Sequence, residues 1–253
     1  MTSQQPTSAL AAARRLLDAR RQGAGVPFRE ILPADRDGAF AIQDATVAGL
    51  GPIGGWKVGA KAIDAPPACA PLPAAGMLPS GAVLQGPPWQ LRGIEVEVAF
   101  RLGTDLDPKG RLLPRAEIVA AIGEVLPVIE VVETRLADWR LSEPLAMLAD
   151  LQSHGALVLG APAAVAPDAV DLRELEAYLA FDGQAVASAR GANPAVDVWR
   201  LLAWLALHCS ERGLPLRAGQ IVTTGSCTGM LFAPAGASVL GQLAGVGQVQ
   251  LQF

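Results

Sequence analysis

The spacing of apolar positions changes near residue 54 of the chain. Before that point, Leu10, Ala13 and Leu17 recur at the spacing of an amphipathic helix, and Gly23 is a typical helix end. This pattern predicts helices over residues 8–21 and about 37–47. After residue 54, short β-branched runs separated by Gly and Pro predict strands. The predicted strands cover residues 56–59, 82–84, 94–102, 128–132, 156–159, 177–181, 221–223 and 246–253.

Two more amphipathic helices interrupt these strands. One is predicted over residues 115–126, with Pro127 starting the next strand, and the other over about 195–212. Four prolines between residues 66 and 73 predict a long loop after Lys57, with a function of its own or the role of a mobile lid. We therefore expect one α+β domain over residues 1–253, with a helical N-terminal arm (1–50) and a β-rich core (51–253).

Composition narrows the classes of function. Hydrophobic residues make up 51% of the 253 residues and charged residues 17%, as in a globular protein with a large core. The formal net charge is −4 and there is no Lys/Arg run, which argues against a nucleic-acid partner. Cys69, Cys209 and Cys227 contain no C-x-x-C pair, so they predict neither a disulfide framework nor a zinc site.

Targeting signals are missing from the sequence pattern. Residues 1–6 are not followed by an apolar segment of the signal-peptide kind, and no apolar run reaches membrane-spanning length. We expect a cytoplasmic protein with no membrane partner.

The clearest chemical signal is an acidic strand. In residues 93–100, Glu95 and Glu97 alternate with apolar residues, so a strand turns both carboxylates to one face with their Cα atoms about 6.6 Å apart. An amphipathic strand with a solvated acidic face explains this pattern. A site for a hard divalent cation explains it too, because Mg²⁺, Mn²⁺ and Ca²⁺ prefer carboxylate oxygens.

Two further charged residues lie in apolar strands. Glu130 follows Ile129 within residues 126–132, and an ionised carboxylate buried there needs a partner. Lys57 is the only cation of the predicted strand after Gly54 and Gly55, where it would bind a substrate carboxylate or exchange a proton. The alternatives are a core salt bridge for the glutamate and a surface position for the lysine.

A small polar segment follows the strand at 221–223. Gly225 and Ser226 offer N–H and O–H donors to an anion, although an ordinary polar turn explains this segment about as well. It does not have the G-x-S-x-G pattern of a nucleophile elbow.

Taken together, these segments resemble one enzyme group. The matching stretches are residues 39–44, 55–59, 93–100, 125–132 and 214–226. In this order they resemble the 2-keto-4-pentenoate hydratase / 2-oxohepta-3-ene-1,7-dioate hydratase group, the hydratase–decarboxylase branch of the fumarylacetoacetate hydrolase superfamily. The resemblance covers nearly the whole chain.

The resemblance implies a mixed β-roll or barrel-like core and assembly into homo-oligomers, with a pathway decarboxylase or hydratase as a further expected partner. It implies Mg²⁺ or Mn²⁺ held by Glu95, Glu97 and Glu130, with Lys57 in the catalytic pocket. It also implies that Leu78, Asp150 and the Gly225–Ser226 loop bind the substrate, a small 2-oxo acid.

Three segments depart from the group's pattern. Residues 69–78 carry no carboxylate where the group commonly has one, and Ala192-Asn193-Pro194 replaces "G-H-P". Asp150 is kept, but "A-D-N-A-S" becomes Ala-Asp-Leu-Gln-Ser-His, which makes His154 either a replacement acid or base or a structural histidine. The metal ligands are therefore retained while the residues around the substrate differ.

The leading hypothesis is a hydratase (a hydro-lyase) that adds water to a 2-hydroxy-dienoate or 2-oxo-alkenoate from aromatic-compound catabolism, giving a 4-hydroxy-2-oxo acid. A 2-oxo-3-enedioate decarboxylase needs the same metal chelate and remains an alternative. Acylpyruvate C–C hydrolysis ranks lower, because no histidine precedes Lys57 to activate water. The non-enzymatic alternative is a catalytically silent subunit that binds or stabilises an active partner.

Overall fold

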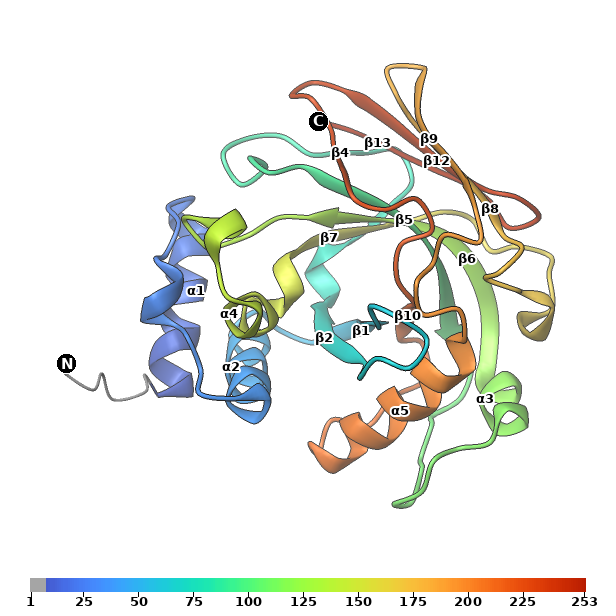
Figure 1. The fold of residues 1–253 in the computed structure, drawn as a ribbon, viewed down its shortest axis with the longest axis horizontal. Helices are drawn as coiled ribbons and strands as arrows, with labels where there is room; N and C mark the ends of the chain where they lie inside the picture. Colours follow the sequence, from blue (N-terminus) through green and yellow to red (C-terminus); the bar gives the residue numbers. More distant parts are fainter. Residues whose placement is uncertain (1–7) are drawn as a thin grey trace.

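The computed structural model describes residues 8–253, so the expected features of residues 1–7 lie outside the described part. Two open mixed sheets and five α-helices make up the fold, which confirms the predicted α+β class and the helical arm (Figure 1). The first sheet has the order β2-β1-β10-β5-β6-β7-β3, with β11 paired to β5. Its strands are β1 (Ile53–Gly59), β2 (Ala68–Pro73), β3 (Met77–Pro79), β5 (Gly93–Leu102), β6 (Ile122–Val132), β7 (His154–Leu159), β10 (Ile221–Thr223) and β11 (Leu231–Phe232).

The second sheet has five strands in the order β4-β13-β12-β8-β9. Its strands are β4 (Ala82–Val83), β8 (Glu176–Phe181), β9 (Gln184–Arg190), β12 (Ser238–Leu243) and β13 (Gly247–Gln252). It packs so closely on the first sheet that a Cβ added to Gly241 of β12 would lie 2.9 Å from Val96 of β5. The two sheets therefore share one core.

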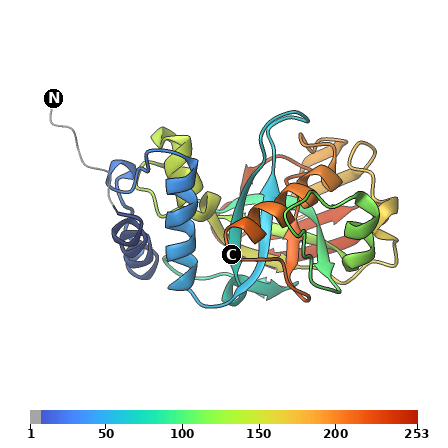
Figure 2. The ribbon, with the colours of Figure 1, turned by 90° about the horizontal axis from the view of Figure 1, so that it is seen from below.

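The helices form two groups. α1 (Ala9–Gln22), α2 (Arg36–Ala48) and α4 (Pro144–Ala149) gather at the left of Figure 1, whereas α3 (Arg115–Ala121) and α5 (Val198–Glu211) lie in its lower right part, and Figure 2 shows the same two groups from below. Local chemistry fixes the helix boundaries, because Ser8 and Asp35 accept N-cap hydrogen bonds. Gly23 ends α1 in the left-handed region, with φ of 67°. Among the described residues, no helix is long and apolar enough to cross a bilayer.

Alternation along the strands gives the first sheet two different faces. Along β5, the residues that alternate with the glutamates, Ile94, Val96 and Val98, are fully buried in the main core. We call the face that carries the glutamates the acid-bearing face and the opposite one the apolar face; the acid-bearing face carries Glu95, Glu97 and Glu130, and the apolar face carries Ile94, Val96 and Ile129. A smaller apolar cluster lies on the acid-bearing face beside the glutamates and consists of Leu72, Ala99, Leu126, Val128, Leu157 and Ile221.

Two sequence predictions were wrong in instructive ways. The helix predicted over residues 115–126 ends at Ala121, and β6 begins at Ile122 and runs through Pro127. Proline fits there because the β6–β7 ladder ends at Val128, opposite Leu159, so Pro127 lies just beyond it, and its carbonyl accepts from the backbone N–H of Gly160. The predicted proline loop contains β2, an edge strand, which is where prolines fit a sheet.

Several elements were not predicted at all: β3, β9, β11, β12 and α4. All the predicted strands appear, and their boundaries differ from the predicted ones by at most a few residues. The exception is β6, which begins six residues earlier than predicted.

Candidate metal centre and active site

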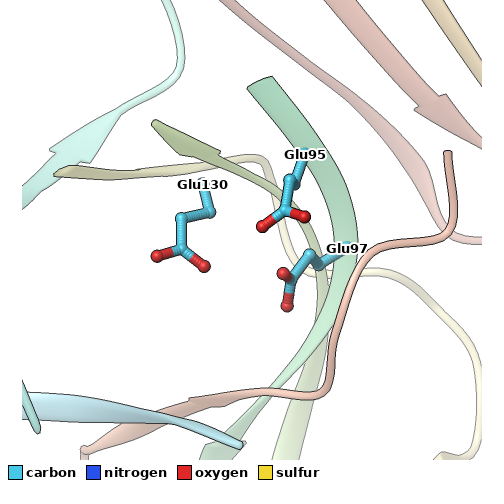
Figure 3. A group of neighbouring side chains, drawn as sticks. All are labelled: Glu95, Glu97 and Glu130. Atoms are coloured by element: carbon cyan, nitrogen blue, oxygen red, sulfur yellow. The ribbon is translucent and has the colours of Figure 1, made fainter. Parts of the chain in front are cut away.

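Three carboxylates meet on the acid-bearing face. Glu95 and Glu97 are two residues apart on β5, and β6 places Glu130 directly opposite Glu95. One oxygen from each carboxylate lies within 4.8 Å of the other two, and Figure 3 shows the three groups turned toward one space. The structure thus brings together the residues that the sequence suggested as a set, and their role as metal ligands stays a prediction.

Glu130 is held by one oxygen only. Its Oε1 accepts from Lys57 Nζ at 2.5 Å and lies 3.0 Å from His154 Nδ1. Its Oε2 is buried and has no hydrogen-bond partner among the described residues. Buried carboxylate oxygens are normally satisfied, so an oxygen left in this way beside two other carboxylates has the environment of a metal ligand.

Burial and mutual repulsion make the cluster costly as three bare anions. Burial raises the pKa of Glu97 to about 8, with the charges of Glu130 and Glu95 adding to it. Burial likewise raises the pKa of Glu95 to about 7, against the opposing charge of Lys57. Two like charges at this distance favour any cation that compensates them, whether a proton or a metal ion.

Lys57 is the cation that the chain itself supplies. Its side chain is 13% exposed. Burial alone would lower the pKa of Lys57, but the carboxylates of Glu130, Glu95 and Glu97 outweigh burial and raise it. Burial alone would raise the pKa of Glu130, but the charge and hydrogen bonds of Lys57 and His154 outweigh burial and lower it. We therefore describe Glu130 as ionised and Lys57 as protonated.

His154 is neutral and completely buried. Burial lowers the pKa of His154 more than its contact with Glu130 raises it. Because Glu130 is ionised, we assign the proton of the neutral ring to Nδ1, where it is donated to the carboxylate. His154 Nε2 then has a free lone pair and no partner among the described residues.

Glu97 is oriented by the loop after β10. Its Oε2 accepts from the backbone N–H of Gly225 at 2.8 Å. Gly225 has a φ of 97°, a conformation that glycine adopts without strain. The carbonyls of Thr224 and Gly225 accept from the side-chain amide of buried Asn193 at 3.0 and 2.8 Å. Gly225 thus reaches the carboxylate cluster directly.

Asn193 is a positioning residue that sequence reasoning missed. The Asn-Pro pair marked a loop, but the partner of Asn193 is more than thirty positions away in the chain and only the fold shows it. Its side chain also accepts from the backbone N–H of Ala195 at 3.0 Å, so the amide is used from both ends.

A left-handed turn comes just before His154. Leu151, Gln152 and Ser153 all have φ between 48° and 58°, an uncommon conformation for residues other than glycine. The carbonyl of Gln152 lies 3.4 Å from Lys57 Nζ, and its buried Oε1 has no partner among the described residues. Three strained residues in succession beside a charged cluster are typical of functional sites.

Asp150 lies behind this turn in an ion pair. Its carboxylate accepts from Arg135 Nε at 2.5 Å and from Thr134 Oγ1 at 3.0 Å, and the same arginine donates to the carbonyl of His154 at 2.6 Å. Asp150 and Arg135 therefore hold the segment that carries His154. Arg135 was not singled out from the sequence, and the substrate-binding role expected of Asp150 stays a prediction.

The side chains of the remaining predicted substrate residues, Ser226 and Leu78, make their contacts with residues other than the three glutamates. Ser226 Oγ donates to the carbonyl of Gly229 at 3.0 Å within its own loop. Leu78 on β3 lies opposite Val158 of β7 and packs against the main core, on the apolar face. A substrate contact of Leu78 would come from its main chain, and both roles stay predictions.

Comparison with known proteins finds a matching family and similar hydratases. Residues 56–253 match the family described as fumarylacetoacetate (FAA) hydrolase, C-terminal. The chain is 32% identical over 160 residues to a 2-keto-4-pentenoate hydratase of Paraburkholderia xenovorans, which is 63% of this chain and 58% of that protein. It is 30% identical over 159 residues to a 2-hydroxyhexa-2,4-dienoate hydratase of Comamonas testosteroni, 63% and 59% of the two chains. The chain thus matches less than two thirds of the length of either hydratase.

A solved structure extends the likeness of fold to nearly the whole chain. The 4-oxalocrotonate decarboxylase of Pseudomonas putida G7, complexed with magnesium and adipate, superposes with a TM-score of 0.83 at 23% identity. The match covers 99% of this chain and 100% of the decarboxylase. Together with the family match, these likenesses confirm the expected resemblance to the hydratase–decarboxylase branch, and the chain belongs to the fumarylacetoacetate hydrolase family.

Proposed function

We propose that the protein is a metal-dependent hydratase that adds water to a 2-hydroxy-dienoate or 2-oxo-alkenoate and forms a 4-hydroxy-2-oxo acid. The observation that carries the proposal is the carboxylate cluster of Glu95, Glu97 and Glu130, in which Glu130 Oε2 is buried without a partner among the described residues. The likeness to two named hydratases supports the reaction class.

The residues present fit a hard divalent ion. Three carboxylates would hold it, and one of them, Glu130, would be oriented by the contacts of its Oε1 with Lys57 and His154. When bound, Mg²⁺ or Mn²⁺ would supply Lewis-acid polarisation to the C1 carboxylate and C2 oxygen of a 2-oxo acid. The magnesium in the related decarboxylase structure supports this class of ion.

Lys57 would hold a proton beside the reacting atoms. The ammonium at 2.5 Å from Glu130 is kept charged by the carboxylates around it. A fixed positive charge in a largely buried site stabilises negative charge that develops on a substrate. We assign Lys57 the catalytic role of charge stabilisation and of proton transfer at Nζ.

His154 would act first on Glu130. By donating from Nδ1, it fixes the carboxylate in the orientation that leaves Oε2 free. Its unpaired Nε2 is the second atom at the site able to accept a proton, which keeps the predicted acid–base role in the proposal. The apolar cluster around Leu126 and Leu157 lies on the same face and excludes water from that side of the site.

Further parts of the proposal concern the surroundings of the reaction. We expect Leu78, Asp150, Gly225 and Ser226 to border the substrate, with Gly225 acting also through its bond to Glu97. We propose a cytoplasmic homo-oligomer and, as a further partner, a pathway decarboxylase or hydratase.

The direct test is the loss of ultraviolet absorbance of 2-hydroxypenta-2,4-dienoate. We expect turnover with Mg²⁺ or Mn²⁺, none after EDTA, and recovery when metal is restored. Equal rates with Mg²⁺ and with EDTA, or no turnover across a panel of dienoates, would contradict the proposal.

Decarboxylation of a 2-oxo-3-enedioate is the second candidate. It needs the same chelate, and the chain is also 28% identical over 156 residues to a 4-oxalocrotonate decarboxylase of a Pseudomonas species. Release of CO₂ from 2-oxohex-3-enedioate, with no hydration of the dienoate, would replace the first proposal by this one.

A further inference from the structure

A cavity separate from the three glutamates lies beside the segment that carries His154. It has a volume of about 520 Å³, within the range of small-molecule sites. The end of α1, the loop before β5 and the segment after β6 enclose it. Its wall includes Arg20, Trp89, Trp139, Glu133, Arg135 and Gly155. None of the three glutamates of the candidate metal centre lines it.

Within residues 8–253, Arg20 takes part in no ion pair, whereas Arg135, the other cation of this cavity, is paired with Asp150. Among the described residues, one hydrogen bond is recorded for Arg20, from Nη2 to the carbonyl of Gly155 at 2.9 Å. A guanidinium has five N–H donors. Burial, with the positive charge of Arg135 adding to it and the negative charge of Asp150 opposing it, lowers the pKa of Arg20 to about 10. Arg20 is therefore a partly desolvated cation that an anion would stabilise.

The other charges of the wall are already used. The carboxylate of Glu133 accepts from the backbone N–H groups of Gln90, Leu91 and Arg92. Arg135 is paired with Asp150. Glu133 is therefore not left as a counterion for Arg20, and Arg135 is not left to bind an anion, so the charged group of the cavity with free donors is Arg20.

Two indoles supply an apolar surface next to this cation. Trp139 donates from Nε1 to Ser153 Oγ at 3.1 Å, which fixes its ring in the wall. Trp89 is half-buried and packs against Phe253, with ring centroids 6.5 Å apart. Flat unsaturated groups pack well on indole rings.

We propose that this cavity binds a small organic carboxylate with a flat, unsaturated body, the carboxylate on Arg20 and the body against Trp89 and Trp139. Recognition of this kind combines a charge-assisted, bidentate pair with a large apolar contact. The bound molecule would also touch the segment 153–155, since Arg20 bonds Gly155 and Trp139 bonds Ser153.

The test is calorimetric titration of the full-length, Mg²⁺-loaded protein with benzoate, benzamide and acetate. Benzoate is expected to bind one site per chain, whereas benzamide, which lacks the charge, and acetate, which lacks the body, bind at least about ten-fold more weakly. Acetate binding as tightly as benzoate, or benzamide binding equally well, would overturn the proposed ligand class.

Variants then locate the site. Arg20→Gln is expected to weaken benzoate binding about ten-fold or more, Arg20→Lys to weaken it less, and Trp89→Leu to weaken it without abolishing it. Arg14→Gln, at an exposed position of the same helix, serves as the matched control and should bind like wild type. Thermal unfolding of each variant checks that it is folded.

One more variant separates the cavity from the metal centre. Glu97→Gln is expected to leave benzoate binding unchanged. Binding lost in Glu97→Gln but kept in Arg20→Gln would place benzoate at the metal centre and overturn the inference, as would the absence of any binding to the wild type. Neither result bears on dienoate turnover, so the proposed hydratase activity is judged separately.

Discussion

The two faces of the first sheet obey different rules although the same strands build them. On the apolar face, Ile94, Val96 and Ile129 are fully buried against the second sheet and the rest of the main core. On the acid-bearing face, the neighbouring positions carry three carboxylates whose oxygens lie within 4.8 Å of one another. One face is satisfied by packing alone, whereas the other needs a cation.

This difference shows how the site is stabilised against its own charge. A buried like-charge cluster costs free energy, and the apolar face of the same strands supplies the compensating burial. The contacts that hold the strands in register are therefore separate from the groups assigned to chemistry. Substitutions on the two faces should accordingly affect different measurements.

The largest effect is expected for Glu97→Gln on the acid-bearing face. The amide can still accept from Gly225, but one charge of the cluster is lost. We expect the metal-dependent rate to fall by at least about 10⁴-fold, a loss that fits within the acceleration typical of enzymes. Thermal stability of the metal-free protein should be unchanged or higher, because like-charge repulsion is relieved.

Turnover of the dienoate and calorimetric binding of Mn²⁺ measure this prediction. The control is Glu124→Gln, which removes a carboxylate of β6 from a half-exposed ion pair with Arg101. Full Mn²⁺ affinity in Glu97→Gln would show that Glu97 is not a ligand.

Lys57→Met tests whether Lys57 and the metal ion both neutralise the negative charge of the three glutamates. We expect the rate to fall about 10²–10⁴-fold, the range for loss of a proton-transferring group. The metal-free variant should also unfold at a lower temperature, because Glu130 loses its buried partner. Added Mg²⁺ should then raise the unfolding temperature of Lys57→Met more than that of the wild type.

Thermal unfolding with and without Mg²⁺ provides the measurement. Lys61→Met, an exposed lysine in the loop after β1, is the matched control. An equal gain from Mg²⁺ in the wild type and in Lys57→Met would mean that the lysine does not compensate the cluster.

Ile129→Ala probes the apolar face one residue away from Glu130. Ile129 is completely buried, so removing its side chain should lower the free energy of unfolding by about 2–5 kcal/mol. Mn²⁺ affinity per folded protein should stay close to that of the wild type. Denaturant unfolding and calorimetry measure the two effects, and a loss of metal affinity without a loss of stability would contradict the separation of the faces.

Local pattern was enough to single out the three carboxylates that the structure brings together. Alternation in β5 predicts that Glu95 and Glu97 share a face, and an acid inside an apolar run singles out Glu130. The sequence does not contain the register that sets Glu130 opposite Glu95, or the contact of His154 with Glu130, because both join segments far apart in the chain.

The errors in the fold have the same cause. Prolines suggested a loop where β2 forms, because whether a strand lies at a sheet edge depends on its neighbours and not on its own residues. The pattern of residues 122–126, Ile-Gly-Glu-Val-Leu, fits a helix as well as a strand, and only its pairing with β5 decides for β6. Asn193 and Arg135 were missed for the same reason, since their partners lie at a distance in sequence.

The smallest effect is expected for Gly241→Ala, which tests how closely the apolar face is packed. The added Cβ would lie 2.9 Å from Val96 Cγ2 and 3.3 Å from Ile129 Cγ1. Both neighbours are β-branched side chains in a filled core, so the sheets must separate slightly, at a cost of about 1–3 kcal/mol in unfolding free energy. Gly59→Ala, where a Cβ meets no neighbour, is the control. Because Val96 lies between Glu95 and Glu97 on β5, a change in metal affinity in Gly241→Ala would show that packing on one face sets the geometry of the other; unchanged affinity with reduced stability would confirm that the faces act separately.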